Sequence, residues 1–262
     1  MALYFERIGK VGVFTFDNGP LNILTPDMHK QLFKQLQDFL IDDSVNVGVL
    51  MGSEGNSFCA GDNIKLKLPD RTKQQELEAH LFRHQNEGDQ PHRPGWEVDV
   101  LQLERYKPII GAVDGYCLGQ GMIYLSCLTD IRVATPNAKM GFPEIAYGMG
   151  GGGGMARLGL QLPHAVAMWH LLTGEPLTAQ QALDHHFINE IVEPKQLKAR
   201  ALAIANRIAA QPPIAVRVEM EAYYKSFDLS RFDSLRYINN LYRLQRMGYS
   251  GYGAGTDFYK QS

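Results

Sequence analysis

The stretch KPIIGAVDGYCLGQG, residues 107–121, decides the fold. Its first half is an apolar run of strand composition, and its second half is a glycine-bearing turn that leads into the apolar helical segment MIYLSCL, residues 122–128. Backbone N–H groups at the start of a helix have no partner within that helix, so this turn can face an anion or a developing oxyanion. A tight turn that requires positive φ is the simpler explanation when the glycine pattern is taken alone.

The same order of elements occurs earlier in the chain. VGVFTF at residues 11–16 and VNVGVLMG at residues 45–52 have the composition of strands. Between them, Thr25 and Pro26 are typical of a helix N-cap and a first helical residue. Apolar residues follow at helical spacing: Met28, Leu32, Leu36 and Leu40. With a further strand at residues 130–135, this order predicts an α/β protein whose parallel or mixed sheet is covered by crossover helices.

Two other segments differ in character from this core. Residues 67–108 are long and polar, with helical patterns at both ends, the second over residues 96–106, and turn composition between them. Such a segment inside a compact domain is typical of a functional cover or a link. After about Pro194 the pattern becomes entirely helical. We expect this last region to pack on itself or on a neighbouring subunit.

Composition excludes several classes of function. The chain has 262 residues and a formal net charge of −2, without the clustered Lys and Arg that nucleic acid or an anionic membrane requires. It has neither a signal-peptide pattern nor a run of about 20 apolar residues, so we expect a soluble, cytoplasmic protein. Its three cysteines, Cys59, Cys117 and Cys127, lack metal-ligand spacing and are interpreted as free thiols in a reducing compartment.

A second glycine-bearing turn, SFCAGDNIK at residues 57–65, also follows a predicted strand, and we expect it to open a helix. One sheet that brings both turns together would create a two-donor oxyanion hole. Two more segments follow in order, DIRVATPNAKMGFPEIAYG at residues 130–148 and LLTGEPLTAQQALDHHFINEIVE at residues 171–193. Together the four segments resemble the crotonase, or enoyl-CoA hydratase/isomerase, superfamily.

The resemblance implies a fold and an assembly. The crotonase fold is an α/β spiral of ββα units that forms two stacked sheets, followed by a helical trimerisation region. It implies that residues 1–195 form the core with the CoA and acyl site, and that residues 196–262 form a helical oligomerisation region. Members of the superfamily usually assemble as trimers or dimers of trimers, so we expect a hexamer. We expect an acyl-CoA thioester as the substrate, with coenzyme A as part of it and no metal or redox cofactor.

The resemblance also assigns binding roles. The backbone N–H groups of Asp62 and Gln120 fall at the positions that bind the thioester oxygen and stabilise an enolate. Residues around the first turn bind the CoA moiety in the superfamily, and in this chain they are Leu21, Ala60, Ile64 and Lys65. An ordinary surface role explains Lys65 equally well.

One of the two glutamates of typical hydratases is absent. Its position is Ile123, whereas the second glutamate is present as Glu144. One carboxylate beside an oxyanion hole suffices to move a proton, so double-bond isomerisation is the first hypothesis. The apolar neighbour Ile123 should raise the pKa of Glu144. Glu144 could instead be a helix N-cap or a surface carboxylate after Pro143.

Several alternatives stay open. Hydration with Asp62 as a substitute acid comes second, and decarboxylation, C–C cleavage or hydrolysis of a specialised acyl-CoA also fits. A non-catalytic acyl-CoA-binding protein is the alternative of another class. Further candidates to replace the missing glutamate have simpler explanations as core, packing or surface residues: Tyr116, Tyr124, His84, Trp96 and Glu97. The glycine run Gly150–Gly154 departs from the superfamily pattern, so the shape of the acyl pocket does not follow from the resemblance.

Overall fold

The computed structural model describes residues 2–67, 70–82, 95–150 and 158–248. A six-stranded sheet runs through its centre in the order β1-β2-β3-β4-β6-β9, and β1 is antiparallel to β2 while the other neighbours pair in parallel. The strands are β1 Leu3–Ile8, β2 Val11–Phe16, β3 Val47–Gly52, β4 Ile109–Val113, β6 Ile131–Ala134 and β9 Glu190–Ile191. A second sheet has the order β5-β7-β8, formed by β5 Tyr116–Leu118, β7 Lys139–Gly141 and β8 Leu177–Thr178.

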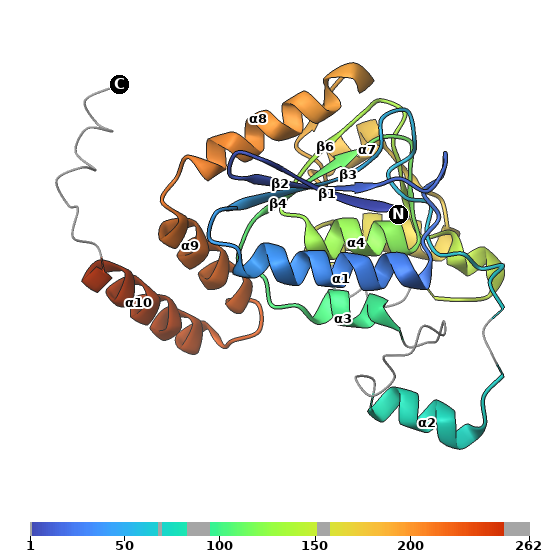
Figure 1. Ribbon diagram of the computed structural model, residues 1–262, viewed down its shortest axis with the longest axis horizontal. Coiled ribbons are helices and arrows are strands. Elements are labelled where there is room, and N and C mark those ends of the chain that lie inside the picture. Colours follow the sequence, from blue (N-terminus) through green and yellow to red (C-terminus); the bar gives the residue numbers. More distant parts are fainter. Residues whose placement is uncertain (1, 68–69, 83–94, 151–157, 249–262) are drawn as a thin grey trace.

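Helices cover both faces of the main sheet (Figure 1). On one face lie α1 Pro26–Ile41 and α4 Gln120–Leu128, with α3 Trp96–Gln102 packed against α1, and on the other face lies α8 Leu197–Ala209. The other helices are α2 Lys73–Leu81, α6 His164–Thr173, α7 Ala179–Asp184, α9 Pro213–Lys225 and α10 Arg231–Gly248, with the 3₁₀ helices η2 Pro143–Tyr147 and η4 Pro194–Gln196. The α/β architecture with two sheets that the sequence analysis expects is therefore present in this chain.

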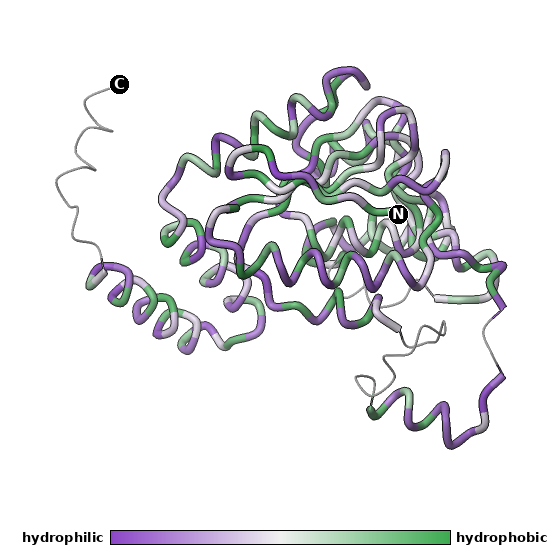
Figure 2. The backbone as a smooth tube through the Cα atoms, viewed as in Figure 1, coloured by the Kyte–Doolittle hydropathy of each residue, from purple (hydrophilic) through white to green (hydrophobic). Residues whose placement is uncertain are grey.

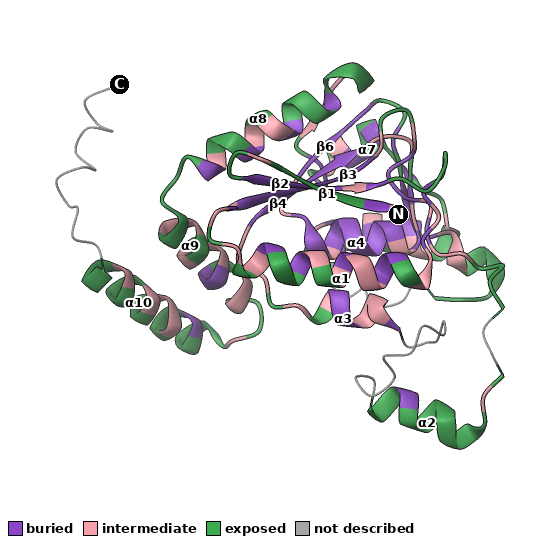
Figure 3. Cartoon of the chain, viewed as in Figure 1, coloured by how far each residue is buried: buried purple, intermediate pink, exposed green. Residues whose placement is uncertain are grey.

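The two apolar layers follow from the alternation of side chains along the central strands. Val13 and Val49 join a cluster on the α8 side, whereas Phe14 and Leu50, one residue further along, join a cluster on the opposite side, with α1 and α4. Strands buried on both faces read as continuous apolar runs. Hydrophobic and hydrophilic residues alternate along α1 and α8 (Figure 2), and the central strands lie buried between these helices (Figure 3).

Most predicted elements occur where the sequence places them. Thr25 caps α1 by accepting a hydrogen bond from the backbone N–H of Met28, and Pro26 is the first helical residue. β3 begins at Val47 rather than at residue 45, and β6 spans Ile131–Ala134 rather than residues 130–135. The predicted helix over residues 96–106 ends at Gln102, because Leu103 has extended backbone geometry.

The helices after residue 195 connect to the core in two ways. α8 contributes Ala201 and Ala205 to the apolar layer of the main sheet. α9 is joined to the core where the hydroxyl of Tyr224 donates to the carboxylate of Asp130. The division of the chain at residue 195 remains a prediction. In the described part of the chain, no helix combines the length and apolarity needed to cross a lipid bilayer.

We predict that Asp130→Ala destabilises the fold strongly. Asp130 accepts two hydrogen bonds from Arg105 and one from the backbone N–H of Ile109, and the Arg105 side chain is only 7% exposed. Loss of the carboxylate leaves a buried guanidinium uncompensated, which costs about 3–5 kcal/mol in free energy of unfolding. Urea denaturation measures this change. The matched control, Glu190→Ala, breaks the solvent-exposed pair with Arg200 and should change stability little. Equal effects of the two substitutions would contradict the prediction.

Candidate active site

Three segments distant in sequence lie side by side at one edge of the structure. The backbone of residues 19–24 bonds to residues 57–63, since Ala60 N–H donates to Leu21 O and Leu24 N–H donates to Gly61 O. Residues 57–63 also pair with β5, through a parallel bridge between Cys59 and Cys117. The buried side chain of Asn22 donates to the carbonyl of Ser57. This network fixes the first glycine-bearing turn against the second.

The two turns approach at their glycines. Gly61 and Gly119 both have positive φ, of 100° and 55°. A Cβ added to Gly61 would lie 3.1 Å from the carbonyl oxygen of Leu118 and 3.6 Å from the backbone nitrogen of Gln120. Gln120 is the first residue of α4, so its N–H has no acceptor within the helix.

The first turn differs from the prediction in one respect. It was expected to open a helix, but residues 62–67 contain no helix. Instead Asp62 forms an isolated parallel bridge with Leu24, and the N–H of Asn63 donates to the carbonyl of Leu24. Backbone pairing to residues 19–24 therefore fixes this turn, and a helix N-terminus is available only at the second turn.

Glu144 lies against the second turn. It is the second residue of η2, and its Oε1 would be only 2.6 Å from a Cβ placed on Gly119. Its Oε2 is buried and has no hydrogen-bond partner among the described residues. Burial raises the pKa of the Glu144 carboxyl above its ordinary value, and the negative charge of Asp62 raises it further. The structure thus brings Asp62, Gln120 and Glu144 to one place.

Asp62 does not stand alone. Its Oδ1 lies 3.0 Å from Nε2 of His29, and Nδ1 of His29 lies 2.6 Å from the hydroxyl of Tyr124. His29 is 4% exposed and Tyr124 is fully buried. The sequence analysis did not identify His29, although a polar residue next to Met28 on the buried face of an amphipathic helix is a signal that could have found it.

Tyr124 was interpreted as helix core and is buried as expected, but its hydroxyl is also engaged. Burial raises the pKa of Tyr124 well above its ordinary value, and the charges of Asp62 and Glu97 raise it further. Nε2 of Gln120 is buried without a hydrogen-bond partner among the described residues. Polar groups from three elements therefore meet behind the two turns.

Ile123, at the position of the absent glutamate, is 6% exposed and belongs to the apolar cluster beneath α4. Burial is the largest cause of the raised pKa of Glu144, so the shift has the direction that the sequence analysis expects. The side chain of Ile123 is a hydrocarbon and cannot donate or accept a proton.

The four candidates for CoA binding lie on and beside the first turn. Leu21 is 44% exposed and its carbonyl accepts from Ala60, while Ile64 is 71% exposed. Lys65 is exposed, and no carboxylate in the described ranges forms an ion pair with it. These residues form an accessible surface with apolar groups and a cation. Their binding role remains a prediction.

The remaining candidates have separate locations. Trp96 packs against Phe33 at a ring-centroid distance of 5.3 Å, as expected of a packing residue. Tyr116 is 42% exposed at the start of β5. Glu97 influences Tyr124 electrostatically. His84 and residues 151–154 of the glycine run lie outside the described residues.

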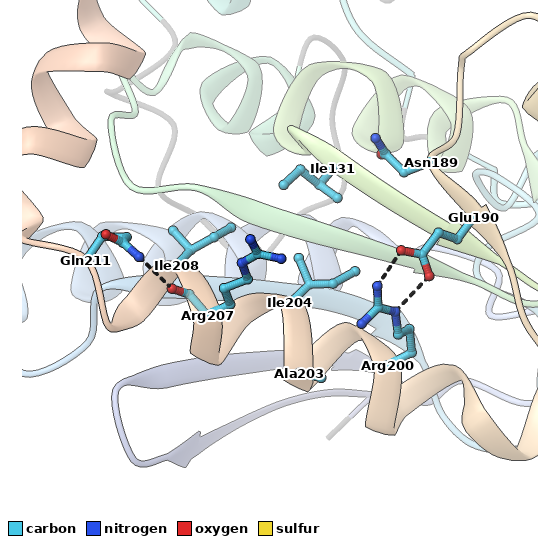
Figure 4. A pocket seen from close by; sticks show the side chains of 9 residues that line it. All are labelled: Ile131, Asn189, Glu190, Arg200, Ala203, Ile204, Arg207, Ile208 and Gln211. Atoms are coloured by element: carbon cyan, nitrogen blue, oxygen red, sulfur yellow. Dashed lines mark hydrogen bonds and ion pairs between the residues drawn. The ribbon is translucent and has the colours of Figure 1, made fainter. Parts of the chain in front are cut away.

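A surface pocket of about 390 Å³ lies elsewhere, between α8 and the edge of the main sheet (Figure 4). An ion pair between Arg200 and Glu190 spans part of it, and Ile131, Ile204 and Ile208 supply apolar lining. None of the predicted site residues lines this pocket.

Comparison with known proteins places these features in context. The family model described as enoyl-CoA hydratase/isomerase matches residues 6–243. The (E)-benzylidenesuccinyl-CoA hydratase of Thauera aromatica is 32% identical over 86% of this chain and 83% of its own length. The short-chain-enoyl-CoA hydratase of Clostridium acetobutylicum is 32% identical over 83% of this chain and 78% of its own. The crystal structure of an enoyl-CoA hydratase subunit from Geobacillus kaustophilus superposes with a TM-score of 0.84 at 26% identity, covering 100% of this chain and 96% of that one.

We predict that Asp62→Asn lowers the pKa of Glu144. The substitution removes a negative charge that disfavours ionisation of the Glu144 carboxyl, and the amide oxygen keeps an acceptor for His29. Burial remains, so the pKa should stay above its ordinary value. Carbon-NMR titration of glutamate-labelled protein measures it, with Glu144→Gln to identify the resonance. An unchanged or higher pKa in Asp62→Asn would contradict the electrostatic coupling.

Proposed function

Because the chain belongs to the enoyl-CoA hydratase/isomerase family, we propose that it is an acyl-CoA thioester enzyme that moves a proton beside the thioester carbonyl through an enolate. One observation carries the proposal. Glu144 lies against Gly119 of the second turn with a buried, unpartnered oxygen and a raised pKa. A carboxyl group with these properties is suited to take up and release a proton.

The proposed reaction is double-bond isomerisation. The backbone N–H groups of Asp62 and Gln120 donate to the thioester oxygen of a 3-enoyl-CoA, and the carboxylate of Glu144 removes a proton from C2. The electron pair moves into a dienolate, and its negative charge rests on the oxygen held by the two donors. Protonated Glu144 then returns the proton to C4, which gives the 2-enoyl-CoA. No atom is gained or lost, and one carboxylate suffices.

The apolar residue Ile123 supports isomerisation over simple hydration. Hydration needs groups that hold and activate a water molecule, and Ile123 offers none at the position where typical hydratases have a glutamate. We propose that Leu21, Ala60, Ile64 and Lys65 contact the CoA moiety. CoA enters as part of the substrate, and the proposed chemistry uses no further cofactor. Assembly as a trimer or a dimer of trimers, and a cytoplasmic location, rest on the resemblance and composition alone.

Hydration is the second candidate function, and a specific observation favours it. The charge of Asp62 acts on Glu144, so a second carboxylate lies near the first. Two carboxylates could hold a water between them and add it across a 2-enoyl-CoA. The two relatives named above are hydratases. Decarboxylation, C–C cleavage and hydrolysis could use the same oxyanion donors, but no contact among the described residues favours one of them.

We predict that mass spectrometry of the products, formed in heavy-oxygen water, distinguishes the two reactions. Incubation with 3-enoyl-CoA thioesters of short and medium chain length should give a shifted double bond without label. Incubation with 2-enoyl-CoA thioesters should give no labelled hydroxyl product. Label incorporated as an added water would instead identify hydration and assign Asp62 as the first residue to substitute next.

The control is Glu144→Gln, which keeps the size of the side chain but removes the proton carrier. Loss of general acid–base catalysis should lower turnover by about 10²- to 10⁴-fold. If wild type and variant both lack turnover of every thioester while CoA ligands still bind, the chain is a non-catalytic binding protein and the enzyme proposal fails.

We predict that Gly119→Ala removes activity without unfolding the protein. The new methyl group would lie 2.6 Å from Oε1 of Glu144, so the carboxylate must move from its place beside the turn. A misplacement of about 1 Å can cost about 100-fold in rate. The matched control is Gly9→Ala, which has a similar positive φ of 62° but nothing within 4 Å of the added carbon. Circular dichroism checks the fold, and wild-type turnover in Gly119→Ala would refute the placement of Glu144.

A further inference from the structure

A buried chain of three polar side chains lies behind the first turn. Asp62 comes from the turn itself, His29 from the first helical turn of α1, and Tyr124 from α4. The side chain of His29 is 5% exposed and that of Asp62 is 12% exposed. Tyr124 is fully buried, so Asp62 is the member with access to solvent. The three hydrogen-bonded side chains therefore connect the interior of the protein to the candidate active site.

The contacts of these three side chains determine which atoms donate and which accept each hydrogen bond. The carboxylate of Asp62 can only accept, so Nε2 of His29 carries the proton that bridges the 3.0 Å between them. In a neutral imidazole Nδ1 is then an acceptor, and the hydroxyl of Tyr124 donates to it across 2.6 Å. Both ring nitrogens are thus used, and Tyr124 fixes the tautomer that presents a donor to Asp62.

The backbone contacts of Asp62 link the position of its side chain to the position of the first turn. Asp62 is bridged to Leu24, which immediately precedes the N-cap of α1, and α1 carries His29 on its buried face. A movement of the Asp62 side chain is therefore coupled to the turn whose N–H is proposed to bind the thioester oxygen. The same side chain carries the negative charge that acts on Glu144.

We propose that His29, held by Tyr124 at one ring nitrogen, is a positioning residue that anchors the Asp62 carboxylate with the other and so fixes the first oxyanion donor and the charge facing Glu144. This inference rests on the proposed function, because it assigns the oxyanion role to Asp62. It applies equally to isomerisation and to hydration, since both need the enolate oxygen to be held.

The test compares two substitutions of His29. His29→Leu removes the donor to Asp62, whereas the side-chain amide of His29→Gln can place an N–H near the position of Nε2. His29→Leu should lower kcat by about 100-fold, the cost of a small misplacement, while KM stays near the wild-type value because the CoA contacts are intact. His29→Gln should recover most of the loss. In an Asp62→Asn background, His29→Leu should add little, because the two residues act as one unit.

A second readout does not depend on turnover. Acetoacetyl-CoA forms an enolate whose absorbance reports directly on the oxyanion site. His29→Leu should weaken this absorbance and His29→Gln should retain it. The matched control is Tyr224→Phe, which removes a tyrosine hydroxyl from a carboxylate in the separate network around Asp130 and should leave both readouts unchanged.

The outcomes separate the two proposals. If Glu144→Gln turns over like wild type, the proposed function fails, and the acetoacetyl-CoA absorbance still tests the role of His29. If Glu144→Gln is inactive as proposed but His29→Leu keeps wild-type kcat and absorbance, the positioning role is overturned. It is also overturned if His29→Gln is no better than His29→Leu in a variant that circular dichroism shows to be folded.

Discussion

The close approach of two backbone segments is the constraint on which the rest of this structure depends. A Cβ on Gly121 would lie 2.4 Å from the carbonyl oxygen of Cys59, and one on Gly61 would lie 3.1 Å from the carbonyl oxygen of Leu118. A real Cβ atom does not approach a backbone oxygen as closely as 2.4 Å. The turns at residues 57–65 and 115–121 can therefore meet only if these positions are glycine, and their meeting places the N–H of Gln120 beside Gly61.

The sheet explains why these two turns meet. β3 and β4 are neighbouring parallel strands, so their carboxyl ends lie at the same edge of the sheet, and each strand leads into one of the turns. Ligand sites of open α/β sheets occur at such an edge. Packing adds precision, since Gly111 of β4 lets the Leu125 side chain of α4 lie directly on the strand. This contact fixes the distance between the main sheet and α4, the helix that begins at Gln120.

The sequence predicts the parts of this arrangement that depend on local chemistry. The cap at Thr25, the strands, both turns and the retained Glu144 are each visible in a short segment. The chain of Asp62, His29 and Tyr124 is not, because its members are separated by 33 and 95 residues and meet only when α1 packs beside α4. The first turn was wrongly expected to open a helix for a related reason. Its amides bond to residues 19–24, and that pairing cannot be read from the turn itself.

The departures from the superfamily pattern are physically linked. With Ile123 at the position of one glutamate, Glu144 is the acid that remains of the pair, and its burial favours the protonated form. Asp62 introduces a carboxylate at another side of the site, and a carboxylate with an exposed fraction of 12% requires a hydrogen-bond donor. His29 supplies this donor, and Tyr124 satisfies the second nitrogen of His29. The carboxylate of Asp62 thus has its donor within the protein, and its negative charge further favours the protonated form of Glu144.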